Sequence, residues 1–350
     1  NKDYAQYLVS YGELASKAIM SSEDMNLYYA IRDLSDVKEN KLSTKNEIEN
    51  CEKNLIKAYK NISYTSESSL LSRMNWWTVE YGLVGNLDNP KIYGAGLLSS
   101  VAESENCLTK KVKKIPLGLD CINYNYDITE QQPQLFVTPS YQHLRKVLND
   151  LSEKMSYKIG GLFGLNTAIK AKTICTVEID NHLYISGKLV SYKHKNNSIT
   201  FLKFNDQVQL SYEKSEIRGH GINYHSHGYS TPLGQLENYN KSIDQLNNNE
   251  IKKLNLQKTQ IVKLEFLDGI HLVGKIENIL RRSSKIILIT FNNCTVKQHD
   301  ETLFQPEWGK FDMLCGTKIT SVYGGAADVS NYYKYINVEN KYIQTFHKHL

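Results

Sequence analysis

The chain has 350 residues, which is long enough for two or three domains with cores of their own. Its net charge of +5 is mild and its basic residues are spread along the sequence, which argues against nucleic acid as the main partner. No signal peptide or bilayer-length apolar run is found and the six cysteines lack C-x-x-C spacing, so we expect a reducing, cytoplasmic compartment and no membrane partner.

Two other features of composition need an interpretation before the elements are considered. The 24 tyrosines, together with many Asn and Lys, read as a compositional bias of the source and not as a site. The sequence opens at Asn1, without Met, directly on a helical pattern. We therefore expect a chain cut inside a domain, with part of a site lying upstream.

Helical patterns dominate the first 155 residues. Apolar and aromatic side chains recur at helical spacing from Tyr4 onward. The segment that begins at Ser21 is a plausible helix cap, and Ser100 followed by Glu103 has the spacing of a capping box. The chain turns extended near residues 91–93, the glycines within 94–96 permit a close approach of the backbone, and a short strand is expected over 134–137. Helices are predicted over residues 4–15, 25–34, 45–62, 66–84, from Ser100 onward, and over 141–155.

Glu80 is the side chain in this half that most needs an explanation. It lies inside the aromatic stretch WWTVEYGL at residues 76–83, and the stretch KIYGAGLLSS at 91–100 follows closely. A carboxylate in such surroundings is costly unless it is paired, protonated or bound to a metal. The residues alone leave three interpretations open: a metal ligand, a general acid or base, or one half of a buried ion pair with Arg73.

A period-two pattern, typical of strands, replaces the helical one after residue 160. The pattern occurs twice, and four pairs of positions are separated by the same 87 residues: Val177 and Leu264, Gly187 and Gly274, Ile199 and Ile286, Phe204 and Phe291. A constant offset over four anchors predicts that residues 173–234 and 260–326 are a duplicated β unit. The Asn-, Lys- and Gln-rich segment between them is either a helix or a linker.

The stretches at 76–83 and 91–100 resemble the tetrahydropterin-dependent aromatic amino acid hydroxylases. Two further segments agree in order, one at residues 3–16 and one at 126–133. The resemblance covers residues 1–155 and implies that they are the mostly α-helical C-terminal portion of a catalytic domain. Together with the period-two pattern, this predicts an α+β fold that continues with a first β unit (160–234), a linker or helix (235–256), and a second β unit with a tail (257–350). Each β unit would be a small barrel or sandwich.

The resemblance also implies a chemistry, the ring hydroxylation of an aromatic amino acid by O2, most simply phenylalanine to tyrosine. The family uses Fe(2+) held by two histidines and one glutamate, together with tetrahydrobiopterin. Glu80 takes the place of the metal ligand. The other implied roles are Trp76, Tyr81 and Tyr126 in substrate binding, Ser99 as a hydroxyl orienting an iron-bound imidazole or the substrate carboxylate, and Glu103 as an acceptor behind the ligands.

Two departures from the family pattern qualify this transfer of roles. The family has Tyr where this chain has Asn75, and no histidine occurs before His143, so this chain alone lacks the histidine pair and would be inactive. We expect that pair to lie upstream. The alternative is a non-catalytic relative or fragment whose β-rich half is a binding or oligomerisation module, and a homo-oligomer is left open.

Three histidines lie close together, His220, His225 and His227, in a Gly-rich loop of the first β unit. Imidazoles at this density can bind zinc or copper. Their spacing matches no closed structural site, however, and a polar loop with exposed histidines is the simpler interpretation.

Overall fold

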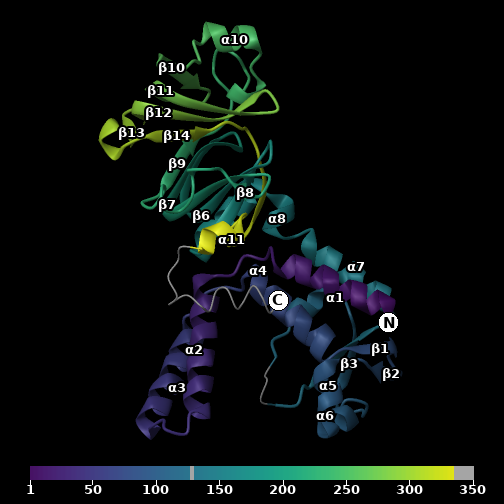
Figure 1. The fold of residues 1–350 in the computed structure, drawn as a ribbon. Helices are drawn as coiled ribbons and strands as arrows, with labels where there is room; N and C mark the ends of the chain where they lie inside the picture. Colours follow the sequence, from purple (N-terminus) through teal and green to yellow (C-terminus); the bar gives the residue numbers. More distant parts are fainter. Residues whose placement is uncertain (127–129, 335–350) are drawn as a thin grey trace. The chain divides into compact units, whose positions relative to one another are not determined.

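The structure is a computed structural model that describes residues 1–126 and 130–334. It is an α+β protein of two compact units, one holding residues 1–158 and the other beginning at residue 159 (Figure 1). Part of the hydroxylase-like segment at 126–133 and the predicted C-terminal tail lie outside the described residues. All six cysteines are free thiols, and none of the described helices is both long and apolar enough to cross a membrane.

Helices form most of the first unit. Ser21 caps α2 as the sequence predicts, with a reciprocal bond to Asp24, and Thr44 caps α3 in the same way. These two helices lie side by side (Figure 1). The helices of this unit are α1 (Lys2–Ala15), α2 (Ser22–Glu39), α3 (Lys45–Lys60), α4 (Glu67–Asn75), η1 (Trp76–Glu80), α5 (Ala95–Ser99), α6 (Val101–Asn106), η2 (Leu119–Asn123), α7 (Tyr141–Ser152) and α8 (Ser156–Ile159).

A four-stranded sheet accompanies these helices in the order β2-β1-β4-β3, with β1 and β3 both parallel to β4. Its strands are β1 (Leu83–Asn86), β2 (Asn89–Ile92), β3 (Lys113–Pro116) and β4 (Gln134–Thr138). The helix predicted over residues 66–84 is therefore wrong at its end, because Val84 belongs to β1. A Cβ on Gly82 would lie 2.2 Å from the carbonyl oxygen of Thr78, so only glycine permits the turn from helix to strand here.

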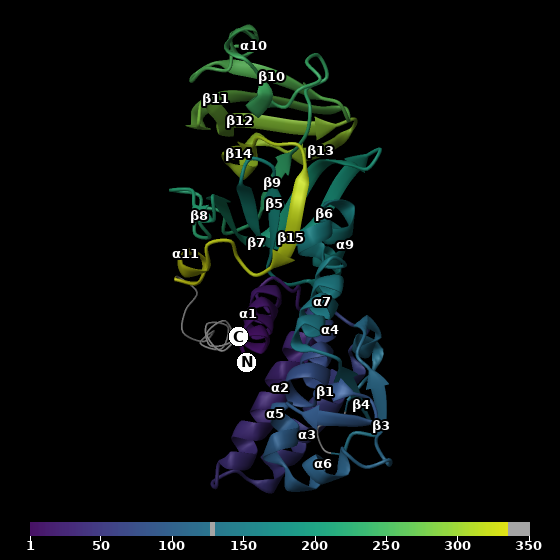
Figure 2. The same ribbon diagram turned by 90° about the vertical axis from the view of Figure 1, so that its right-hand side faces the viewer.

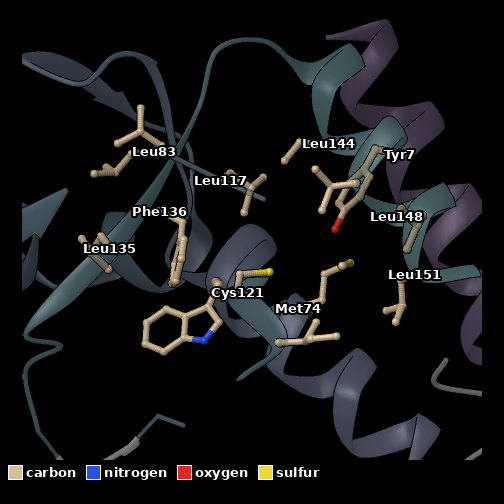
Figure 3. Packing of buried hydrophobic residues seen from close by; sticks show 14 of the residues in the cluster. Tyr7, Met74, Leu83, Leu117, Cys121, Leu135, Phe136, Leu144, Leu148 and Leu151 are labelled. Carbon is tan, nitrogen blue, oxygen red and sulfur yellow. The ribbon is translucent and has the colours of Figure 1, made fainter. Parts of the chain in front are cut away.

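The core of this unit joins α1, α4, α7 and the sheet (Figure 3). Tyr7, Met74 and Phe136 are at most 1% exposed, and burying a side chain of this size contributes roughly 1.5–3 kcal/mol. The Tyr7 hydroxyl lies 2.8 Å from the hydroxyl of Thr78, within hydrogen-bonding distance. The core thus fixes the segment that ends in Glu80 against α1.

The second unit contains two sheets (Figure 2). One has the order β15-β5-β6-β7-β8 with β9 paired to β7, and the other has the order β10-β11-β12-β13 with β14 paired to β12. Helices α9 (Gly161–Ala171), α10 (Asn248–Lys253) and α11 (Val329–Tyr333) accompany them, with short turns η3 (Ile243–Gln245) and η4 (Pro306–Trp308). The strands are β5 (Cys175–Ile179), β6 (Leu183–Lys195), β7 (Ser198–Tyr212), β8 (Ser215–Glu216), β9 (Tyr229–Pro232), β10 (Ile261–Phe266), β11 (Ile270–Arg282), β12 (Lys285–Gln298), β13 (Glu301–Phe304), β14 (Phe311–Leu314) and β15 (Ile319–Gly324).

The two sheets exchange segments with each other. Strand β15, late in the sequence, pairs with β5 of the first sheet, whereas Leu236, which follows β9, forms a bridge to Phe266 of β10 in the second sheet. The sheets therefore do not follow the boundary predicted at residue 257. The segment 235–256 carries the short helix α10, and its Leu236 and Ile251 are buried in the core of the second sheet, so it is packed and not a free linker.

Candidate functional site around Glu80

Glu80 is the last residue of a π-helical turn that continues α4. The backbone N–H of Tyr81 donates to the carbonyl oxygen of Trp76 at 2.9 Å, which is the i to i+5 bond of such a turn. Single π turns at the end of α-helices occur often at functional sites. The sequence pattern predicted a regular helix and contained no signal for this turn.

Two glycines bring α5 close to Glu80. A Cβ on Gly94 would lie 2.4 Å from the Glu80 carbonyl oxygen, and a Cβ on Gly96 would lie 3.3 Å from its carboxylate oxygen Oε2. The φ of Gly94 is −64°, an ordinary value, so glycine is needed there for space and not for an unusual backbone angle. The close approach expected at residues 94–96 is present, and it places the start of α5 beside the carboxylate.

The Glu80 carboxylate has no stabilising partner within the part of the chain that the structure describes. It is half-buried, and no hydrogen bond or ion pair to it is found among those residues. Arg73, the partner of the ion-pair interpretation, donates instead to the carbonyl oxygen of Ile122 at 3.0 Å. The ion-pair interpretation is therefore wrong, and the interpretations as metal ligand or as acid and base remain.

Tyrosines surround this carboxylate. Burial and the neighbouring Tyr141 raise the pKa of Tyr4, and the negative charge of Glu80 adds to that shift. Rings of Tyr4, Tyr93 and Tyr141 meet with centroids 5.3–5.4 Å apart. These tyrosines therefore pack together beside the segment that carries Glu80. Tyr4 and Tyr7 are three residues apart on one face of α1, and that spacing was the signal.

Trp76 and Trp77 differ in role although they are adjacent. Trp77 is fully buried and its indole N–H donates to the carbonyl oxygen of Tyr124 at 3.0 Å. Trp76 is half-buried, and the rings of Tyr81 and Tyr126 stack on it with centroids 4.6 and 4.4 Å away. Of the four residues expected to bind substrate, the three aromatic ones thus form one stack, and Ser99 is not part of it. The indole N–H of Trp76 is buried and finds no acceptor among the described residues.

The structure places Ser99 and Glu103 differently from each other. Ser99 is exposed at the end of α5, and its hydroxyl donates to the carbonyl oxygen of Gly96 at 2.9 Å. Glu103 is half-buried, burial raises its pKa, and its charge is among the causes that raise the pKa of Tyr81. Ser100 accepts from the backbone N–H of Glu103 at 3.3 Å, which confirms the helix cap predicted there. Glu103 is thus close enough to Tyr81 to affect it electrostatically, whereas the hydroxyl of Ser99 is engaged by its own helix.

Among the described residues, no group of three metal-ligand side chains includes Glu80. Nε2 of His143, the first histidine of the sequence, lies 2.9 Å from the carbonyl oxygen of Leu117 and takes part in a backbone hydrogen bond. Within residues 1–126 and 130–334, the three-membered group of metal-ligand side chains lies in the second unit. Glu80 can supply one ligand of an iron site. The described residues do not supply the two histidine ligands beside it.

Comparison with known proteins bears directly on this segment. Residues 59–168 match the sequence model of the biopterin-dependent aromatic amino acid hydroxylases. Those residues are similar to that family. Phenylalanine-4-hydroxylase of Dictyostelium discoideum is 41% identical over 85 residues, which are 24% of this chain and 19% of that protein. The human phenylalanine-4-hydroxylase is 43% identical over 86 residues, which are 24% of this chain and 18% of that protein.

The hydroxylase match is partial in both directions. The chain spans about a fifth of the length of the curated relatives it matches. The alignment with a solved phenylalanine hydroxylase from Legionella pneumophila covers 29% of this chain and 48% of the Legionella chain, at 30% identity. Its TM-score of 0.22 is too low to establish a shared fold. All the predicted hydroxylase residues, from Trp76 to Tyr126, lie inside the matched range, whereas the segment predicted to be similar at residues 3–16 lies outside it.

Proposed function

We propose that Glu80 is the carboxylate ligand of the iron in a tetrahydrobiopterin-dependent monooxygenase. The substrate would be an aromatic amino acid, most simply phenylalanine hydroxylated to tyrosine, as the relatives' names suggest. The observation that carries the proposal is a half-buried carboxylate on a π turn, without a protein partner among the described residues, inside a segment of this family. Iron and pterin would activate O2 when bound, and the two imidazole ligands would come from histidines outside the described residues.

The residues of this chain would then bind the aromatic substrate and orient the groups around the metal. The stack of Trp76, Tyr81 and Tyr126 offers an aromatic wall for a substrate ring, and Gly94 and Gly96 leave room for the carboxylate to turn toward a metal. Glu103, whose pKa is raised by burial, would act on the site through Tyr81. The Ser99 hydroxyl would accept from the N–H of an iron-bound imidazole while it still donates to the carbonyl oxygen of Gly96. It would have to release that carbonyl oxygen to donate to a substrate carboxylate.

The proposal is tested on the full-length gene product with the variants Glu80→Ala and Ser99→Ala. Loss of a ligand should lower both bound iron and hydroxylation of phenylalanine by about 100-fold or more, while Ser99→Ala, which removes an orienting hydroxyl and no ligand, should lower iron affinity only about 10-fold. Iron content and tyrosine formation are measured in parallel, with tyrosine and tryptophan as competing substrates. Undiminished iron-dependent hydroxylation in the Glu80 variant would overturn the assignment. An equal loss of iron in both variants would show that unfolding, and not the removal of a ligand, lowers the iron content.

We also propose that the second unit is a duplicated β unit that serves in binding or oligomerisation. Strands β6 and β11 each contain 13 residues and begin 87 residues apart, since 270 − 183 = 87, and β7 and β12 also begin 87 apart, since 285 − 198 = 87. The reciprocal exchange of segments between the sheets supports the same origin. Deleting residues 160–350 and measuring molecular mass and hydroxylation tests the role. If both stay unchanged, the module has no part in assembly or regulation.

A further inference from the structure

Two histidines and an aspartate meet in the second unit, away from Glu80 in the sequence and in a different compact unit. His220 and His225 lie in the loop between β8 and β9, and Asp312 lies in β14. One ligand atom from each of the three side chains lies within 4.8 Å of the others. His227, the third histidine of the sequence cluster, is exposed and does not join them.

The distances in this group match those between ligands on one metal ion. Nδ1 of His220 and Nε2 of His225 are 3.3 Å apart. Two nitrogens bound to one tetrahedral zinc at about 2.0–2.1 Å are separated by roughly 3.3–3.4 Å. Oδ2 of Asp312 lies 4.0 Å from Nδ1 of His220, which is too long for a hydrogen bond and needs a shift of about half an ångström to reach the same spacing.

The carboxylate is held in place by a neighbour and is deeply buried. Asp312 is 3% exposed, and its Oδ1 accepts from the hydroxyl of Thr290 on β12 at 2.6 Å. Among the described residues no lysine or arginine pairs with it. A buried carboxylate is costly without a positive partner, and a cation between Oδ2 and the imidazoles would supply one. The Thr290 bond leaves Oδ2 on the histidine side, as in sites where a second residue orients a metal ligand.

The two imidazoles are held just as firmly. The carbonyl oxygens of His220 and His225 accept from the backbone N–H groups of Leu210 and Val208 on β7, at 2.9 and 3.0 Å. Because the backbone of both histidines is fixed to β7, little ordering entropy remains to oppose binding.

We propose that His220, His225 and Asp312 bind a divalent transition-metal ion of the zinc class, which links the two sheets of the second unit. The histidines are anchored to the first sheet and Asp312 to the second, so one ion would join both. Tyr224 is exposed beside the half-buried His220, and its side chain hydrogen-bonds Asp312, so an ion would compete with Tyr224 for this carboxylate. Neutral imidazoles and a carboxylate favour zinc and its neighbours over magnesium or calcium.

The test uses the whole chain after treatment with a chelator and its removal. Zn²⁺ is titrated by calorimetry and Co²⁺ by its visible absorption, with metal content measured directly. We expect one equivalent of Zn²⁺, a tetrahedral Co²⁺ spectrum and a raised melting temperature. Affinity should fall about 100-fold or more in His220→Gln and Asp312→Asn, and roughly 10-fold in Thr290→Val. The amide oxygen introduced by Asp312→Asn would still accept the Thr290 bond, so this variant separates metal loss from unfolding, which circular dichroism monitors.

Two matched controls locate the site. His227→Ala removes an exposed histidine two residues from His225, and Glu80→Ala removes the proposed iron ligand in the first unit; both should leave Zn²⁺ affinity unchanged. The proposal is overturned if Zn²⁺ and Co²⁺ do not bind saturably, if His220→Gln and Asp312→Asn bind as the wild type does, or if Mg²⁺ or Ca²⁺ competes at equal concentration. Failure of the Glu80 proposal would not affect this result, since the two sites share no residue.

Discussion

The region around Glu80 and the cluster of His220, His225 and Asp312 are opposites in sequence and in structure. Around Glu80 the sequence motif is specific, and the hydroxylase family match covers it, yet the described residues bring a single metal-ligand side chain to the site. In the second unit the sequence pattern matches no known site, yet the fold assembles three ligand side chains within 4.8 Å. A motif reports ancestry, whereas a metal site requires side chains from separate elements to converge.

The comparison also separates residues held for stability from residues left free for binding. Glu80 lacks a partner among the described residues, while every member of the second cluster is fixed by a hydrogen bond of its side chain or backbone. Unpartnered polar groups lower stability, and proteins retain them mainly where a ligand completes them. Matched substitutions within the first unit test whether the region around Glu80 is of this kind.

The largest difference is expected between the adjacent tryptophans. Trp77→Ala should lower the free energy of unfolding of the first unit by about 3–5 kcal/mol, because it empties a fully buried volume and frees the carbonyl oxygen of Tyr124. Trp76→Ala should cost about 1–2 kcal/mol, since it removes only the stacking with Tyr81 and Tyr126. Urea unfolding, monitored by hydrogen exchange of the backbone amides in α1 and α4, measures the loss of stability in both variants. Equal losses would mean that Trp76 is a core residue and not part of a binding wall.

A smaller but sharper difference is expected between two glutamates of the same unit. Glu67 is 8% exposed, and its carboxylate accepts from the backbone N–H groups of Ile19 and Ser156 at 3.0 and 2.7 Å. Gln offers one acceptor in place of two, so Glu67→Gln should cost about 1–3 kcal/mol. Glu80→Gln should change stability by less than about 0.5 kcal/mol while it removes the proposed ligand. A large destabilisation by Glu80→Gln would point to a structural partner for Glu80.

The smallest expected effect is the change with pH of the contribution that Glu67 makes to folding stability. Burial raises the pKa of Glu67 above 4.5, although its backbone hydrogen bonds oppose the shift. The folded state therefore binds the proton more tightly than the unfolded state, and the contribution of Glu67 is most favourable at low pH. It declines as pH rises from about 4.5 through the raised pKa. The stability of the wild type minus that of Glu67→Gln, measured from pH 4 to 8, should fall over this range; a rise would mean that the hydrogen bonds outweigh burial.

Local signals in the sequence predicted much of the first unit. The caps at Ser21 and Ser100 were readable because a hydroxyl three residues before a carboxylate satisfies a free N–H of a helix end. The close approach at residues 94–96 was readable because glycine lacks a Cβ. The π turn before Gly82 was not, since a regular helix and a π turn have the same residue pattern and differ only in which carbonyl accepts the bond of Tyr81.

The sequence by itself determined the α+β class, the strands of the second unit and the hydroxylase ancestry of residues 59–168, because periodicity and family motifs are local. Only the tertiary structure decided that Arg73 donates a hydrogen bond to Ile122 and that Tyr4 lies near Glu80. The pairing of β15 with β5 was also decided there. The tertiary structure also decided that Asp312 lies beside two histidines some 90 residues earlier (312 − 220 = 92). Contacts over such distances depend on how sheets pair, and no spacing along the chain encodes that pairing.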